Sequence, residues 1–221
     1  MKAVIVACSW ILPWFLRRRL FRLLFGWQCH ASARIGLAFI APRRLVMEAG
    51  SFIGHLTVCK GLDLLELQEH SSIGRGNWIT GFPLGGNRHF VHQPDRHCEL
   101  VVERHAAITN RHLIDCTSSV RIGAFTTVAG FQSQILTHSI DLAANRQSSA
   151  PVVIGHHCFV GTNCVLLGGA VLPDCSVLGA KSLLNKAYAT PHRLYAGVPA
   201  RELKELPADL PYLTRTVGFV D

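Results

Sequence analysis

Hydrophobic residues recur at every sixth position between residues 154 and 184, a period that fits neither an α-helix nor a β-strand. The aliphatic positions of this series are Ile154, Val160, Leu166, Leu172, Leu178 and Leu184. Four residues after each of the first five comes a small residue, and these are Cys158, Cys164, Ala170, Ser176 and Ser182. The pattern predicts one short strand and one tight corner per repeat, with three repeats in each coil of a triangular solenoid. We expect the aliphatic side chains to point inward and the small residues to lie where the chain turns.

Less regular copies of the repeat begin at about residue 31. Recognisable units start at Ile53, Ile73, Val102, Ile108, Ile114 and Ile122. The step from Ile114 to Ile122 is two residues longer than the repeat, which predicts an insertion at a corner. Two longer breaks, at residues 81–99 and 131–150, predict loops that protrude from a solenoid spanning 31–186, and functional residues commonly lie on such loops. Residues 187–221 are expected to form a C-terminal segment with a short helix and tail.

Residues 1–30 differ from the repeats in composition. A mostly apolar run over 3–16 precedes four arginines, Arg17, Arg18, Arg19 and Arg22, which are interleaved with apolar residues. The run is shorter than the roughly 20 residues that span a bilayer, so it predicts a basic amphipathic helix. Residues 1–27 are therefore expected either to lie on a membrane surface or to cap the open end of the solenoid. A cleaved or membrane-spanning segment fits the pattern less well.

Composition limits the class of protein. The chain has 221 residues, of which 49% are hydrophobic and 16% charged, so it can bury a sizeable core and is not a disordered segment. Its formal charge of +8 favours an anionic partner, and charge alone leaves nucleic acid, a membrane surface and a polyphosphate ligand open. Eight cysteines without a CxxC pair indicate small buried residues in a reducing compartment rather than a disulfide framework or a zinc ribbon.

The break at 131–150 contains the residues best suited to acid–base chemistry. His138 lies three residues before Asp141. Imidazole titrates near neutral pH, and a neighbouring carboxylate can fix its tautomer, so His138 is a candidate general base. Spacing alone does not distinguish such a base from a solvated loop histidine, and the chain has twelve histidines.

Three segments resemble the hexapeptide-repeat acyltransferases, and in particular the branch of galactoside and maltose acetyltransferases and exopolysaccharide O-acetyltransferases. They are residues 109–116 with 120–123, residues 135–141, and residues 196–201. The resemblance covers residues 100–204 well and 31–99 loosely. It implies an all-β solenoid, a left-handed parallel β-helix, here with an N-terminal amphipathic helix and a short C-terminal helical tail. It also implies acetyl-CoA as co-substrate, no metal, and a homotrimer with active sites between neighbouring subunits.

The same resemblance implies roles for individual residues. His138 would remove the proton from a saccharide hydroxyl, which then attacks the thioester directly, and the backbone N–H of Thr162 would meet the oxyanion. The acceptor side would comprise Asn110, Asp115 and Asp141, although Asn110 could instead stack inside a coil and Asp115 cap a corner. The CoA side would comprise Gly161, Thr162, Gly179, Ala180, Lys181, Arg201 and Lys204.

The sequence therefore predicts an O-acetyltransferase acting on a saccharide during the assembly of a surface or exported polysaccharide. The predicted location is the cytoplasm, without a nucleic-acid partner, and peripheral contact of residues 1–27 with the inner face of the membrane stays open. Two other enzymes stay open: an N-acyltransferase for an amino sugar or antibiotic, and a zinc-dependent carbonic-anhydrase-like protein using His89, His92, His97 and Cys98. The third alternative is a non-catalytic scaffold that docks on membranes.

Overall fold

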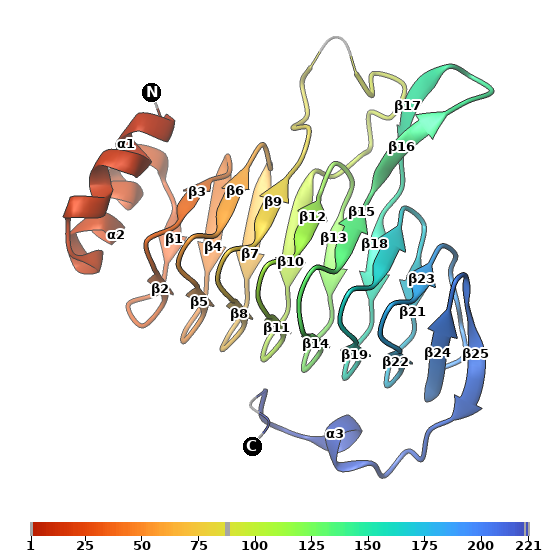
Figure 1. Ribbon diagram of the computed structural model, residues 1–221. Helices are drawn as coiled ribbons and strands as arrows, with labels where there is room; N and C mark the ends of the chain where they lie inside the picture. The colour runs from red at the N-terminus through yellow and green to blue at the C-terminus, as the bar shows by residue number, and fades with distance from the viewer. Residues whose placement is uncertain (1, 87–88, 219, 221) are drawn as a thin grey trace.

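The computed structural model describes residues 2–86, 89–218 and 220, so parts of the predicted loop 81–99 and of both terminal segments lie outside the described residues. Three sheets of short strands form the sides of an elongated prism (Figure 1). The first sheet contains β1 (Gln28–Cys29), β4 (Arg44–Met47), β7 (Leu64–Leu67), β10 (Glu99–Val102), β13 (Val120–Ile122), β18 (Val152–Ile154) and β21 (Val171–Leu172).

The other two sheets follow the first in every coil of the chain. The second contains β2 (Arg34–Ile35), β5 (Phe52–Ile53), β8 (Ser72–Ile73), β11 (Ala107–Ile108), β14 (Thr127–Val128), β19 (Phe159–Val160), β22 (Val177–Leu178), β24 (Arg193–Gly197) and β25 (Ala200–Glu205). The third contains β3 (Phe39–Ala41), β6 (Val58–Lys60), β9 (Trp78–Thr80), β12 (Leu113–Asp115), β15 (Gln134–Leu136), β20 (Val165–Leu167) and β23 (Leu183–Leu184). We call the turns from the first to the second sheet corner 1, from the second to the third corner 2, and from the third to the next coil corner 3.

Stacking of identical positions holds the coils together. Ile154 pairs with Leu172, Val160 with Leu178, and Leu166 with Leu184, each pair one coil apart in parallel register. All six of these side chains are fully buried. The inward-pointing aliphatic column predicted from the six-residue period is therefore confirmed.

The corners explain why the residue four positions after each aliphatic residue is small. His157, Asn163, Cys175 and Lys181 adopt left-handed backbone conformations with φ between 53° and 57°. The next residue in each case, Cys158, Cys164, Ser176 or Ser182, then enters the interior and is buried. A larger side chain at these positions would collide with the coils above and below, because the interior is close-packed.

The N-terminal segment caps the open end of the prism (Figure 1). It consists of α1 (Lys2–Cys8), the 3₁₀ turn η1 (Ser9–Ile11) and α2 (Trp14–Phe25), so the predicted helix is divided in two just before Pro13. Phe21 and Trp27 are buried against the first coil, and the Trp14 indole donates a hydrogen bond of 2.7 Å to the Ala33 carbonyl. In the described part of the chain, no helix has the length and apolar content needed to cross a membrane.

The C-terminal end is closed by an antiparallel hairpin of β24 and β25, which the sequence did not predict. The predicted C-terminal helix is the four-residue α3 (Pro211–Thr214). Beyond β25 the chain returns along corner 1, where the Tyr212 hydroxyl donates to the Cys158 carbonyl at 3.0 Å and Arg215 donates to the Phe125 carbonyl. The tail therefore covers one edge of the prism.

Candidate active site

Two protruding segments leave the prism at corner 3 and meet outside it (Figure 1). One is the loop between β9 and β10, residues 81–98, and the other is the antiparallel hairpin of β16 (His138–Asp141) and β17 (Arg146–Ser149). Gln93 joins them. Its side chain donates to the Ser149 carbonyl at 2.9 Å and accepts from the Ser149 N–H at 3.0 Å and hydroxyl at 2.9 Å. Segments about 50 residues apart thus form one structure around corner 3.

His138 begins the hairpin and is held by Asp115, the last residue of β12. The Oδ2 atom of Asp115 lies 2.8 Å from Nδ1 of His138. Because a carboxylate only accepts hydrogen bonds, Nδ1 carries the hydrogen and Nε2 keeps its lone pair. The imidazole is about one-third exposed, with its side chain at 34%. This arrangement orients a base with one free nitrogen.

Asp115 is buried, and its charge is stabilised by the turn around it. Its two carboxylate oxygens accept hydrogen bonds from both the backbone N–H and the hydroxyl of Thr117 and of Thr137, and from the backbone N–H of His138. Burial raises the pKa of Asp115, but the hydrogen bonds from His138, Thr117 and Thr137 outweigh it and lower this pKa to about 2. Asp115 is therefore ionised at neutral pH.

The ionised carboxylate changes the basicity of its partner. The hydrogen bond to Asp115 raises the pKa of His138 above its ordinary value, against partial burial, which lowers it. His138 is therefore a stronger base than a solvated histidine. A carboxylate that fixes the tautomer of a histidine and raises its basicity is suited to general-base chemistry.

Aromatic residues of the loop between β9 and β10 pack against the imidazole. The rings of Phe82 and Phe90 stand edge-on to His138, with centroids 5.7 and 6.1 Å away. Arg96 supports them: its guanidinium lies 4.7 Å from the centroid of the Phe90 ring and donates to the carbonyls of Phe82 and Thr117. The loop therefore builds one wall of the site.

His138 opens onto a cavity of about 570 Å³ on corner 3. Besides the hairpin, the cavity is bordered by Leu167, Gly168 and Asn185 of the next two coils. A Cβ atom at Gly168 would lie 2.8 Å from the Thr137 carbonyl oxygen. Glycine at this position therefore lets the coil lie close to the base of the hairpin. We call this cavity the corner-3 groove.

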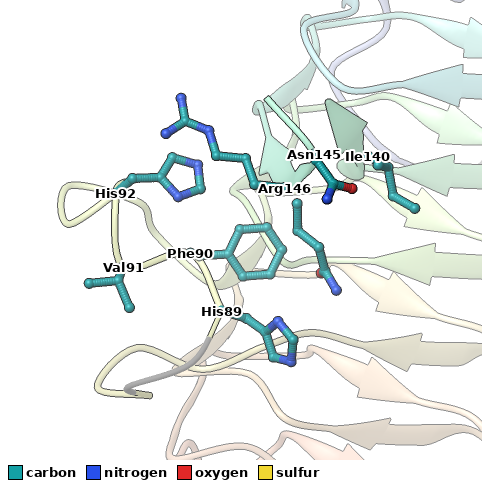
Figure 2. A pocket seen from close by; sticks show the side chains of 8 residues that line it. His89, Phe90, Val91, His92, Ile140, Asn145 and Arg146 are labelled. Atoms are coloured by element: carbon teal, nitrogen blue, oxygen red, sulfur yellow. The ribbon is translucent and has the colours of Figure 1, made fainter. Parts of the chain in front are cut away.

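A second cavity, of about 590 Å³, lies between the loop and the hairpin (Figure 2). It is lined by His89, Phe90, Val91, His92, Ile140, Asn145, Arg146 and Gln147. His138 pairs with Ser149 and Ile140 with Gln147 across the hairpin, so these four side chains lie on one face. Ile140 is two residues from His138, which places this loop pocket roughly 7 Å along the strand from the imidazole. Its lining combines apolar, amide and basic groups and contains no carboxylate.

The acceptor-side residues expected from the sequence do not all meet. Asp115 contacts His138. Asp141 borders the corner-3 groove together with His138, but its carboxylate accepts hydrogen bonds from the N–H groups of Ala143 and Ala144 at the hairpin turn, 3.1 Å each. The carboxylate that fixes the imidazole is thus Asp115 and not the neighbouring Asp141. Asn110 lies half-buried at corner 2, where its Oδ1 accepts from the Arg75 N–H at 2.9 Å.

The residues expected to bind CoA also lie away from His138 within one chain. Five of them are at corner 2 or follow strands that enter it: Gly161, Thr162, Gly179, Ala180 and Lys181. Arg201 and Lys204 are exposed on β25 at the C-terminal end. None of the seven borders the corner-3 groove or the loop pocket. Within one chain, the third sheet therefore lies between the predicted base at corner 3 and the predicted CoA residues at corner 2.

The histidines considered as zinc ligands do not converge. His89 and His92 border the loop pocket, while His97 borders a different cavity next to Arg43 and Asp63. The Cys98 thiol is buried and donates to the Gly61 carbonyl at 3.2 Å. Within residues 2–86, 89–218 and 220, no three His, Cys, Asp or Glu side chains are grouped in a way that could hold a metal ion.

Several residues of the site were not found from the sequence. They are Phe82, Phe90, Gln93, Arg96, Thr117 and Thr137. Thr117 carries one usable signal, because it lies in the two-residue insertion between Ile114 and Ile122 that bulges at corner 3. The loop residues carry none, because their contacts with His138 and Ser149 join segments more than 40 positions apart.

No protein-family model matches this sequence, and no curated protein matches it. A hexapeptide-repeat-containing acetyltransferase from Vibrio cholerae is similar in structure, with a TM-score of 0.55 and 19% identity over 93% of this chain and 89% of that one. The N-acyltransferase AntD from Bacillus cereus, solved with dTDP-4-amino-4,6-dideoxyglucose and coenzyme A, is similar with a TM-score of 0.50 and 12% identity over 71% and 83%. At this identity the likeness shows the fold, and the predicted left-handed parallel β-helix of the hexapeptide-repeat acyltransferases is confirmed.

Proposed function

We propose that this protein is an acetyl-CoA-dependent O-acetyltransferase that acts on a saccharide hydroxyl. The observation that carries the proposal is the Asp115–His138 pair, 2.8 Å apart, placed between two cavities at corner 3 of a β-helix. The known fold of hexapeptide-repeat acyltransferases supports it. A fold alone does not establish an activity, so the site geometry has to supply the chemistry.

The proposed reaction is a direct transfer. Nε2 of His138 takes the proton of the acceptor hydroxyl as its oxygen attacks the thioester carbonyl carbon, and Asp115 stabilises the resulting imidazolium. A C–O bond forms, the C–S bond breaks, and the departing CoA thiolate takes the proton back from His138. The products are an acetyl ester and CoA with a free thiol, and no acyl-enzyme is formed.

We place the acceptor in the loop pocket and the thioester in the corner-3 groove. The pocket and His138 lie on the same hairpin face, and the pocket's amide and basic groups suit the hydroxyls of a sugar, while Phe90 and Ile140 suit its apolar faces. The groove is where the imidazole is accessible. Bringing both reactants to one nitrogen supplies much of the expected acceleration.

We further propose a homotrimer with composite sites. Corner 3, with His138, and corner 2, with Gly161, Thr162 and Lys181, are different edges of one prism. Three prisms packed around a threefold axis would set corner 3 of one copy against corner 2 of the next. The groove would then receive the pantetheine arm along Gly161 and Gly179 of a neighbouring copy, with the Thr162 N–H at the oxyanion and Lys181, Arg201 and Lys204 near the phosphates.

The setting that we propose is the cytoplasmic assembly of a surface or exported polysaccharide. The second candidate is transfer to an amine, and it is favoured by one observation: AntD, which shares the fold, is an N-acyltransferase solved with an amino sugar nucleotide. An amine that is protonated in water also needs a base before it can attack, so His138 would serve both reactions.

An acceptor screen with labelled acetyl-CoA and mass spectrometry of the products tests the proposal. We expect acetylated saccharides whose label is released by mild alkali, because an ester hydrolyses there and an amide does not. Alkali-stable products on amino sugars would replace O-transfer by N-transfer. No transfer to any saccharide or amine, by a protein that binds acetyl-CoA, would refute the proposed function.

A further inference from the structure

The outward face of the N-terminal cap is apolar. Ile11 is 89% exposed, Leu23 is 84% exposed and Phe15 is 57% exposed. Val4 and Leu16 of the same segment are also exposed. Single exposed apolar residues are ordinary, but these five and Trp10 all lie within the first 23 positions and form a surface that water solvates poorly. We call this surface the cap face.

Polar and apolar residues of α2 are not segregated as they are on a surface helix of a soluble domain, because both of its faces are mixed. Arg17 is buried at 3% exposure and donates to the Gly36 carbonyl at 3.1 Å, while Phe15 and Leu23 face outward. Phe15, Arg19, Arg22 and Leu23 are spaced by four, three and one residues, so they share one stripe of the helix. Apolar side chains and arginine heads are therefore presented together on the cap face.

The charge around the cap face has one sign. Residues 1–47 contain eight Lys or Arg and no Asp or Glu, and the first carboxylate of the chain is Glu48. Arg19 and Arg22 are exposed within the cap face itself. Such a surface attracts an anionic partner over distances of about 10 Å at moderate salt.

We propose that the cap face docks the protein on a bilayer rich in anionic phospholipids. Arginines would contact the lipid phosphates while Ile11, Phe15 and Leu23 enter the boundary between headgroups and acyl chains, as in amphipathic helices that lie on membranes. Charge complementarity selects this occupant over a second copy of the chain. Two cap faces in contact would bring Arg19 and Arg22 against like charges with no carboxylate to offset them.

Docking in this way leaves the candidate active site open. The cap covers one end of the prism, whereas the hairpin and the loop between β9 and β10 protrude from its side several coils away (Figure 1). A bound protein would therefore hold the corner-3 groove near the membrane without covering it. This inference is independent of the proposed chemistry, because its test measures binding and not turnover.

The test uses the full chain and sedimentation with vesicles of phosphatidylcholine alone or with about 30 mol% phosphatidylglycerol. We expect binding to the anionic vesicles only, weakening as KCl is raised. Two double variants target the cap face, Ile11→Asp with Leu23→Asp and Arg19→Glu with Arg22→Glu. Each is expected to lower the bound fraction about tenfold or more, since a charge of the wrong sign or a buried carboxylate is costly at the interface.

Matched controls change the same residue types elsewhere. They are Leu142→Asp, at a residue 88% exposed in the hairpin turn, and Arg75→Glu with Arg111→Glu, two exposed arginines at corner 2. These controls are expected to bind like the native chain. Binding that is equal in all variants, or that does not depend on anionic lipid, would overturn the proposal. So would cap-face variants that keep vesicle binding but change the oligomeric state, since the cap face would then be a contact between copies.

Discussion

At the scale of single residues, the chemistry depends on one hydrogen bond, from His138 Nδ1 to Asp115 Oδ2. Neither partner is distinctive in the sequence: His138 is one of twelve histidines, and Asp115 follows an ordinary aliphatic repeat position. The fold brings them together because β12 and β15 are neighbours in the third sheet, with Asp115 opposite Leu136. The chain that leaves Leu136 then passes directly over the Asp115 carboxylate.

Replacing Asp115 tests this pairing through the pH dependence of activity. Asp115 raises the pKa of His138, so Asp115→Asn should return that pKa toward its ordinary value. Because the base works only when neutral, the acidic limb of the kcat/KM profile should move to lower pH. The plateau should fall about tenfold to a hundredfold, since the base is weaker and its tautomer less well fixed.

The matched control for this change is Asp141→Asn, which alters a carboxylate that borders the same groove but accepts from the turn N–H groups of Ala143 and Ala144 and not from His138. It should leave the acidic limb in place. An acidic limb that does not move in Asp115→Asn, in a variant with native thermal stability, would show that Asp115 does not set the basicity of the catalytic group.

His138 was identifiable from sequence only because its segment resembles a known family. The role of Asp115 could not be identified from the sequence, because Asp141 is a carboxylate nearer to His138 along the chain. Distance along the chain is a poor guide here, since Asp141 lies toward the turn of the hairpin. Besides the His138 imidazole, five donors from Thr117, Thr137 and the His138 backbone stabilise ionised Asp115. Threonine is common at corners, so the sequence does not reveal that these hydroxyls bind the same carboxylate.

At the scale of elements, the regular coils were predictable and the additions were not. The six-residue period runs without a break from Ile154 to Leu184, and each position of the repeat has the same environment in every copy. The period therefore predicts which side chains are buried and where the chain turns. The hairpin of β24 and β25 breaks the repeat, and its outer strand is almost entirely exposed, so it lacks a hydrophobic pattern that would reveal it. The packing of the loop between β9 and β10 depends on a few long-range contacts.

Gln93 provides the sharpest test at this scale, because its side chain makes all three hydrogen bonds to Ser149. Each bond is worth about 0.5–1.5 kcal/mol, so Gln93→Ala should free the loop without unfolding the coils. We expect faster amide hydrogen exchange in residues 89–98 and 138–149 and a higher KM for the acceptor, with the KM for acetyl-CoA little changed. Gln28→Ala, at an exposed position of β1, is the control.

Unchanged exchange in both segments of Gln93→Ala would mean that the loop is held by other contacts. A rise in the KM for acetyl-CoA instead of the acceptor would contradict the assignment of the loop pocket to the saccharide.

At the scale of the whole molecule, we propose that the site is completed between copies. His138 at corner 3 and Lys181 at corner 2 belong to different edges of one prism, and Arg201 lies beyond the last coil. The sequence predicted both sets of residues through the resemblance. The resemblance also implied sites between subunits, but which edge of the prism carries each set follows only from the sheet that each repeat joins.

Mixing two inactive variants tests this arrangement. His138→Ala removes the base, and Lys181→Glu with Arg201→Glu reverses charge on the CoA side. In trimers formed from equal amounts of both, about a quarter of composite sites would contain neither change, so co-expression should restore activity well above that of either variant alone. No restoration, with mixed oligomers demonstrated by differential tags, would place each site within a single chain.

The central claim is that the imidazole of His138 is the general base for acetyl transfer, and the most direct measurement is the rate of transfer from acetyl-CoA by His138→Ala. We predict a fall of about a hundredfold to ten-thousandfold in kcat with unchanged binding of acetyl-CoA. The matched variant is His156→Ala, which removes a histidine whose Nδ1 lies 3.3 Å from Glu103 at corner 1, and it should retain native activity. A His138→Ala protein that transfers acetyl groups as fast as His156→Ala would contradict the account.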